Sequence, residues 1–237
     1  VRGIQSNHVI STLKHFAINP QETGRAFMNT VIAEDALRES DLLAFEIAIE
    51  EGNPGAIMCA YNATMGAQSC GNRFLLTEVL REDWGYDGFV MSDWGAVDAL
   101  DYALAGLDQQ SGAGIDPQPF FGQPLKQAAQ SDPVYRERLA EMVRRILYAI
   151  YDNGLDAHPA AMGSVDTAAN SEVAHQVARA GIVLLTNVGG ILPLGAEVKR
   201  IAVIGGHADA GTPVGGGSSK VLADEGPAFT MPYLSDG

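Results

Sequence analysis

The chain has 237 residues, of which 46% are hydrophobic and 19% are charged, and its formal net charge is −14. This composition is typical of a globular protein with a buried core. The negative charge argues against binding to the phosphate backbone of nucleic acids, which needs a basic face. No apolar run approaches the roughly 18 residues of a membrane span. A soluble enzyme that acts on neutral or cationic molecules fits this balance best.

The two ends of the sequence carry no sign of a complete protein. The first residue is Val1, with neither an initiator Met nor a basic-then-apolar signal peptide. The last stretch, MPYLSDG, has no helix or strand pattern that would close a domain. We therefore expect a processed product or a piece of a larger protein.

Short apolar runs alternate with longer helical patterns over the first two thirds of the chain. The patterns predict, in chain order, a strand over 8–19, a helix over 30–52, a strand over 55–62, a helix over 73–86, a strand over 88–94, a helix or a helix followed by a strand over 96–107, and a helix over 134–154. Strand and helix thus alternate about every 30 to 40 residues, as βαβ units with a parallel sheet require.

The composition changes after this alternating part. Residues 155–172 are small and loop-like and are predicted to be a linker. A helical pattern (SEVAHQVARAG), an apolar run (IVLLTN), a turn and another apolar run (KRIAVIGG) follow. These patterns predict a first domain over 1–154 and the start of a second α/β domain over 173–237.

Polar side chains stand where the predicted strands end. They are Lys14-His15, Tyr61-Asn62, Asp93-Trp94 and, after the 96–107 segment, Asp108. In parallel α/β folds the functional site lies at the carboxyl ends of the strands. Successive strands that end in this way favour an enzyme over a scaffold.

The sequence does not match several well-known motifs for nucleotide binding, metal binding or serine hydrolysis. The glycine-rich stretch over 205–217 fits neither the dinucleotide fingerprint nor the phosphate loop, so no nucleotide cofactor is predicted. None of the five histidines has partners at metal-ligand spacing, and no Gly-x-Ser-x-Gly elbow occurs. The sequence therefore predicts no metal site and does not favour a serine hydrolase.

The polar strand ends suit a sugar site. Hydroxyl groups need charged or bidentate partners, and the apolar face of a pyranose stacks on an aromatic ring. Lys14, His15, Arg25 and Tyr61 supply the polar groups, and Asp93 with Trp94 supplies a carboxylate and a ring. Considered alone, Asp93 would be predicted to cap the N-terminus of a helix. The whole constellation favours a carboxylate nucleophile of a retaining glycosidase.

Several stretches in the same order resemble glycoside hydrolase family 3, the group of β-glucosidases and β-xylosidases. They are KHFAINPQETGR at 14–25, IMCAYNATMG at 57–66, GFVMSDWGA at 88–96, AGLDQQSG at 105–112 and ARAGIVLLTNVGGILPL at 178–194. The resemblance covers nearly the whole chain. It implies the later part of a (β/α) TIM-type barrel followed by the beginning of an α/β sandwich domain.

The resemblance also implies roles for single residues. Asp93 would be the nucleophile, with Met58 and Tyr61 beside it, and Trp94 would pack on the sugar. Ser218 or Ser219 would lie in a loop of the second domain that lines the pocket. The sugar hydroxyls would be bound by Lys14, His15 and Arg25.

The spacing of Cys59 and Cys70 leaves open whether they pair or remain reduced thiols. The resemblance favours a disulfide, because some secreted family members carry a cysteine pair around this loop. It also implies an extracellular or periplasmic protein.

The sequence departs from the family by what it lacks. The early barrel strands and the general acid/base, usually a Glu beyond the GGGSS stretch, have no counterpart here. We expect a central fragment of a β-glucosidase that releases terminal β-D-glucosyl residues once other segments of the same enzyme complete it. The alternatives are a β-xylosidase and a non-catalytic carbohydrate-binding relative. The expected partners are a β-glucoside or oligosaccharide substrate and those remaining segments, and a homo-oligomer is left open.

Overall fold

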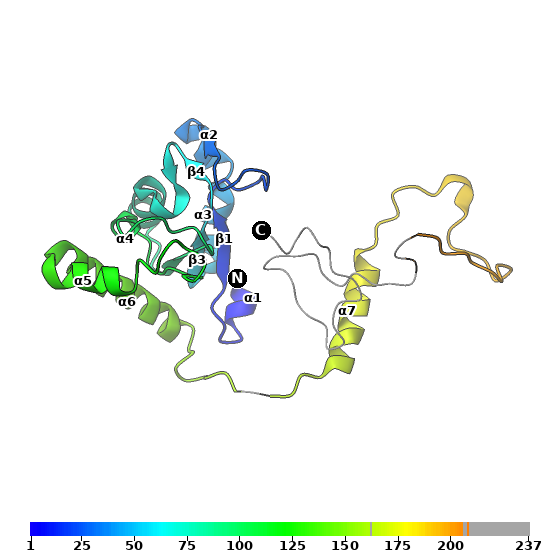
Figure 1. Cartoon of the computed structure of the whole chain (residues 1–237). Helices are drawn as coiled ribbons and strands as arrows, with labels where there is room; N and C mark the ends of the chain where they lie inside the picture. The colour runs from blue at the N-terminus through cyan, green and yellow to red at the C-terminus, as the bar shows by residue number, and fades with distance from the viewer. Residues whose placement is uncertain (162, 206–207, 209–237) are drawn as a thin grey trace. The chain divides into compact units, whose positions relative to one another are not determined.

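Three parallel strands form the central sheet of the first unit, in the order β1-β3-β6 (Figure 1). The strands are β1 (Thr12–Phe16), β3 (Ala56–Cys59) and β6 (Phe89–Ser92). The middle strand β3 is buried along its whole length, as expected for a parallel strand covered on both faces. The computed structural model describes residues 1–161, 163–205 and 208.

The register of the sheet brings the ends of β3 and β6 to the same edge. Met58 lies opposite Met91, and Cys59 lies opposite Ser92. A parallel bridge between Met91 and Gln109 adds a short fourth segment beside β6. Asp93, which follows β6 directly, therefore emerges at the carboxyl edge of the sheet.

A second, smaller sheet follows the order β2-β4-β5, with β2 (Asn29–Thr30), β4 (Ala63–Thr64) and β5 (Ala67–Gln68). The helices of the first unit are α1 (Arg2–Gln5), α2 (Glu34–Glu39), α3 (Leu43–Gly52), the 3-10 helix η1 (Ser69–Gly71), the π-helix η2 (Phe74–Asp83), α4 (Tyr102–Ala105), α5 (Gln123–Ser131) and α6 (Pro133–Asp152). Helices α5 and α6 pack side by side (Figure 1).

The main core lies between the sheet and helices α2, α3 and η2. Ile57 and Val90 from the sheet are fully buried in it. Four residues of η2, namely Leu75, Leu76, Val79 and Leu80, are fully buried in the same cluster. Burying each such side chain favours folding by about 1.5–3 kcal/mol, so this contact holds β3 and β6 in place.

Several helical segments differ from the predicted ones. The single helix predicted over 30–52 is two helices, because the backbone of Ser40 leaves helical geometry and its hydroxyl donates to the carbonyl of Ala36. In the predicted 96–107 segment only α4 is helical, and Gly106, with φ of 122°, ends it. Helix α5 was not predicted, because its sequence (QPLKQAAQS) has few apolar residues and begins with a Gln-Pro pair that resembles a turn.

A buried ion cluster holds the strand that ends at Asp93. The carboxylate of Asp108 accepts hydrogen bonds from Arg81 (3.0 Å), Arg138 (2.6 Å) and Arg145 (3.2 Å), and its side chain is fully buried. It also accepts one from the backbone N–H of Val90 in β6 (2.8 Å). The cluster therefore connects β6 to η2 and α6.

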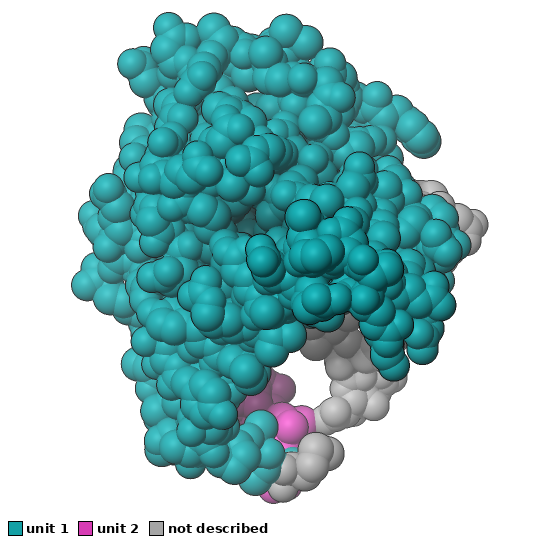
Figure 2. Space-filling view, turned by 90° about the vertical axis from the view of Figure 1, so that its left-hand side faces the viewer, with its two compact units in different colours: residues 1–163 teal, residues 164–237 magenta. Residues whose placement is uncertain are grey.

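The chain divides into two compact units, residues 1–163 and 164–237, and Figure 2 shows the first in teal. The division falls inside the segment predicted to be the linker. In the second unit, helix α7 (Thr167–Gly181) starts inside the predicted linker, and its N-cap Asp166 accepts a hydrogen bond from the N–H of Ala169 (3.0 Å). A short 3-10 helix, η3, spans Val188–Gly190.

The strands predicted at 182–187 and 199–206 differ from the structure. Residues 182–187 and 199–204 form no strand, and residue 206 lies outside the described part of the chain. The apolar pattern of a strand is not sufficient, because a strand is defined by backbone hydrogen bonds to a partner strand, and these segments pair with no strand among the described residues.

Within the described ranges, no helix has both the length and the apolar character that a membrane crossing needs.

Candidate active site

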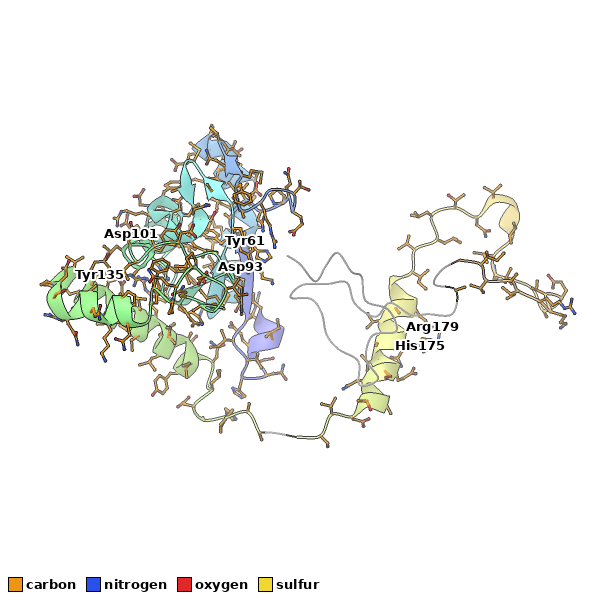
Figure 3. The ribbon with its side chains drawn as sticks, in the orientation of Figure 1. Tyr61, Asp93, Asp101, Tyr135, His175 and Arg179 are labelled. Atoms are coloured by element: carbon orange, nitrogen blue, oxygen red, sulfur yellow. A yellow bond between two sulfur atoms is a disulfide. The ribbon has the colours of Figure 1, made fainter. Side chains whose placement is uncertain are left out.

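Asp93 lies at the carboxyl edge of the sheet, where three groups approach its carboxylate. The hydroxyl of Tyr61 is 3.1 Å from Oδ1, and the backbone N–H of Trp94 donates to the same oxygen at 2.8 Å. Nε2 of His15 lies 3.4 Å from Oδ2. The side chain of Asp93 is 13% exposed, so a small molecule can still reach it. Tyr61 and Asp93 lie next to each other in Figure 3.

Tyr61 comes from the segment after β3 and reaches across to the end of β6. Its hydroxyl lies within hydrogen-bond distance of Asp93 and of the main-chain oxygen of Trp94. Burial and then the negative charge of Asp93 raise the pKa of Tyr61 to about 12. The phenol therefore stays protonated at neutral pH and can donate a hydrogen bond.

His15 and Lys14 stand side by side on β1, where the peptide bonds Lys14–His15 and Phe16–Ala17 are cis. Burial lowers the pKa of His15; the charge of Asp93 opposes this, and the positive charges of Lys14 and Arg25 reinforce it. The imidazole is therefore neutral at neutral pH. Lys14 is exposed, and its ammonium group is open to a ligand.

Arg25 follows β1 on an irregular segment. Its guanidinium lies over the ring of Tyr61, with 4.5 Å between Cζ and the ring centroid. Its Nη1 also pairs with Glu22 at 3.0 Å. His15 and Tyr61 thus contact the carboxylate of Asp93 and Arg25 lies over Tyr61, although these residues lie on separate segments of the chain, and Lys14 precedes His15 on the same strand.

Trp94 is 44% exposed and lies directly after Asp93. Its indole packs against Gly112, a contact that the sequence did not predict. The sequence indicates this contact only through Gly112 itself, which follows the AGLDQQS stretch. Because glycine has no side chain, another side chain can approach its backbone closely.

Met58 has a different position from the other predicted site residues. It is 7% exposed in the interior of β3 and faces Met91 on β6. No hydrogen bond joins it to Asp93 in the described part of the chain. Ser218 and Ser219, which were predicted to line the pocket, lie outside the described residues.

Cys59 and Cys70 form a disulfide, with their Cα atoms 5.1 Å apart. Cys59 is the last residue of β3 and Cys70 belongs to η1, so the bond closes the loop that carries Tyr61. Among residues 1–161, 163–205 and 208, no group of three or more His, Cys, Asp or Glu side chains is arranged to hold a metal ion.

Comparisons with known protein families match both units of the chain. Residues 1–148 match the model of the glycosyl hydrolase family 3 N-terminal domain, and residues 182–235 match that of the family 3 C-terminal domain. The predicted fold class, a barrel portion followed by the start of an α/β sandwich, is confirmed by these matches and by similar solved structures.

Two curated relatives are similar over nearly the whole chain. Beta-glucosidase B of Emericella nidulans is 38% identical over 232 residues, which cover 94% of this chain and 27% of that protein. An exo-α-(1→6)-L-arabinopyranosidase of Bifidobacterium longum is 37% identical over 242 residues, which cover 97% of this chain and 31% of that protein.

A solved β-glucosidase from Streptomyces venezuelae, in complex with D-glucose, superposes with a TM-score of 0.74 at 39% identity. The match covers 82% of this chain and 26% of that one. The chain therefore spans less than a third of the length of the relatives it matches.

Proposed function

The chain belongs to glycosyl hydrolase family 3, and from this we propose that the complete protein hydrolyses terminal, non-reducing β-D-glucosyl residues with retention of configuration. The observation that carries the proposal is the approach of Tyr61, His15 and the N–H of Trp94 to the carboxylate of Asp93. The relatives named as β-glucosidases support glucose as the sugar.

Asp93 is the nucleophile in this proposal. One carboxylate oxygen attacks the anomeric carbon, the bond to the leaving oxygen breaks, and a general acid protonates that oxygen. Water then attacks the same carbon, gives its proton to the same acid/base group and releases Asp93. Such a mechanism needs a second carboxyl group about 5–5.5 Å away. We assign that role to no described residue.

The neighbouring side chains bind the sugar. Lys14, His15 and Arg25 present donors for its hydroxyls, and the half-exposed ring of Trp94 presents a flat face on which it can stack. Tyr61 donates a hydrogen bond to the carboxylate that carries the negative charge before attack. Met58 remains a proposed neighbour of the nucleophile, and Ser218 remains a proposed part of the pocket wall.

A second candidate activity is the hydrolysis of α-L-arabinopyranosides. One observation favours it, namely 37% identity to the Bifidobacterium longum enzyme over 242 residues. Arabinopyranose, like xylopyranose, lacks the hydroxymethyl group that glucose carries at its fifth carbon. A panel of aryl β-D-glucoside, β-D-xyloside and α-L-arabinopyranoside therefore distinguishes the glucosidase from both alternatives.

We further propose that the protein works outside the cytoplasm. The disulfide between Cys59 and Cys70 supports this, because such bonds persist mainly in oxidising compartments. Secretion of the tagged complete protein by its host tests it, and retention of the whole population in the cytoplasm would reject it.

The test of the activity uses the complete protein and the substitution Asp93→Ala. Turnover of the preferred aryl glycoside should fall by at least about a thousandfold, with an unchanged circular dichroism spectrum. The matched control is Asp156→Ala at an exposed position, which should retain full activity. Residual turnover near the control level would remove Asp93 from its role. Glucose binding without any turnover by the unmodified protein would instead identify the carbohydrate-binding alternative.

A further inference from the structure

The indole of Trp94 rests on the backbone of Gly112. A Cβ atom added to Gly112 would lie 2.8 Å from Cβ of Trp94 and closer still to Cγ and Cδ1 of the indole. Carbon atoms in van der Waals contact are about 3.5–4.0 Å apart. Every side chain other than hydrogen would therefore push the ring away from its present place. Gly112 also has φ of 66°, which disfavours any other residue there.

The loop that carries Gly112 is held by hydrogen bonds on both sides, and these bonds oppose its displacement by Trp94. The amide of Gln110 donates to Asp116 and to the carbonyl of Gln118, and its oxygen accepts from the N–H of Phe121. Asp116 in turn accepts from the N–H of Val97 at 3.3 Å. Gln110 thus bonds the loop to Gln118 and Phe121, and Asp116 bonds it to Val97, which follows Trp94 in the chain.

The same loop also contacts the turn that follows Trp94. The N–H of Ile115 donates to the carbonyl of Gly112 at 2.9 Å, which closes a tight turn. A Cβ atom on Gly95 would lie 3.4 Å from Cγ2 of Ile115. The indole therefore has the backbone of Gly112 on one side, and the turn after Gly112 is in van der Waals contact with Gly95, the residue that follows Trp94.

We propose that Gly112 is a positioning residue, which fixes the plane of the Trp94 indole beside Asp93 and so sets how the sugar stacks. The part that concerns the sugar rests on the proposed function. The part that concerns the ring rests only on the contact between Gly112 and Trp94.

The test substitutes Gly112→Ala in the complete protein labelled with fluorotryptophan, and it records the fluorine NMR spectrum without substrate. Trp84, which packs edge-on against Phe16 with 6.1 Å between ring centroids, is the internal reference within this unit. The Trp94 resonance is assigned by its loss in Trp94→Phe. We expect its chemical shift to change in Gly112→Ala, while the chemical shift of Trp84 stays the same.

Two other glycines provide matched controls. Gly114→Ala lies in the same loop with open space around its added Cβ, and Gly66→Ala adds a Cβ in open space at a positive φ of 90°. Neither should move the Trp94 resonance. An unmoved resonance in Gly112→Ala, or an equal shift in either control, would overturn the inference.

Kinetics test the consequence for the sugar. Misplacement of a substrate-contacting group by about 1 Å can cost about a hundredfold, so kcat/KM per active site should fall about 10- to 100-fold in Gly112→Ala. Both controls should stay within about twofold, whatever they do to the melting temperature. A moved resonance with unchanged kcat/KM would overturn the positioning role while leaving Asp93→Ala to decide the proposed function separately.

A double substitution covers the case in which Gly112→Ala does not fold. Trp94→Gly removes all three atoms nearest to the added Cβ. Adding Gly112→Ala to Trp94→Gly should then lower the melting temperature no more than Gly66→Ala does in the unmodified protein. An undiminished loss in the double variant would show that the ring is not what Gly112 accommodates, and the inference would fail.

Discussion

The hydroxyl of Tyr61 connects two segments of the candidate site, because it reaches both Asp93 and the carbonyl of Trp94. Tyr61 therefore holds Asp93 and Trp94 in a fixed relative position, and misplacing a reacting group by about 1 Å can cost about a hundredfold. On this ground we expect Tyr61→Phe to lower kcat about 10- to 100-fold. Tyr151→Phe, at an exposed position 61% accessible to solvent, is the control and should leave kcat unchanged. Steady-state kinetics on the complete protein decide this, and equal rates for the two variants would refute the role of the phenol.

The protonation of His15 is a second property of single residues. Burial lowers its pKa below 6.5, and Asp93 opposes the shift, so removing that charge with Asp93→Asn should lower the pKa of His15 further. Because the unfolded chain binds this proton more readily, the contribution to stability is present above pH 6.5 and is lost as pH falls through the folded-state pKa. NMR titration of the imidazole measures the pKa of His15 in the unmodified protein and in Asp93→Asn. A pKa at or above 6.5 in the unmodified protein would contradict the account.

At this scale the sequence predicted the residues but not their contacts. The proximity of His15, Tyr61 and Asp93 could be predicted because the carboxyl ends of parallel strands meet at one edge, whatever the details of the loops. The place of Arg25 over the ring of Tyr61 depends on an irregular segment, and the floor that Gly112 provides depends on how its loop folds back. No periodicity encodes either path.

The strand β6 is the element that determines where Asp93 stands, and Asp108 holds it through the N–H of Val90. Asp108→Asn would leave Arg81, Arg138 and Arg145 buried with too little negative charge. Breaking a buried pair costs about 3–5 kcal/mol in the free energy of unfolding.

Denaturant unfolding of Asp108→Asn measures this cost. Arg2→Gln removes an exposed pair with Glu51, whose side chains are 76% and 71% exposed, and should cost less than about 1 kcal/mol. A loss in Asp108→Asn no larger than in this control would mean that the cluster does not hold β6.

Sequence patterns located the central elements better than the peripheral ones. The strands β3 and β6 carry unbroken apolar runs because both faces are covered, and this signal is local. The break at Ser40 involves a side-chain hydrogen bond to Ala36, which a search for apolar periodicity does not register, and helix α5 is stabilised by packing against α6. The segments 182–187 and 199–204 show the reverse case, since their apolar patterns are those of strands but the described residues include no partner for them.

The boundary between the two compact units of the chain lies between residues 163 and 164, within the linker proposed over 155–172. The described residues from 156 to 166 are all exposed, and only a few backbone hydrogen bonds hold them. Exposed segments of this kind are where proteases cut first. We therefore propose that limited proteolysis of the complete protein leaves a resistant fragment that ends between residues 155 and 172. Cuts between residues 56 and 150 at an equal rate would refute the proposed domain boundary.

In the proposed mechanism, Asp93 becomes covalently bonded to the sugar. This bond can be trapped with a deoxyfluoro-β-glucoside whose fluorine replaces the hydroxyl next to the anomeric carbon, because such a sugar slows release of the glycosyl-enzyme more than its formation. Digestion and mass spectrometry of the inactivated complete protein should find the fluoroglucosyl group on the peptide that contains GFVMSDWGA, with the modification on Asp93. A label on a different carboxylate, or turnover with no covalent label in any peptide, would contradict the account.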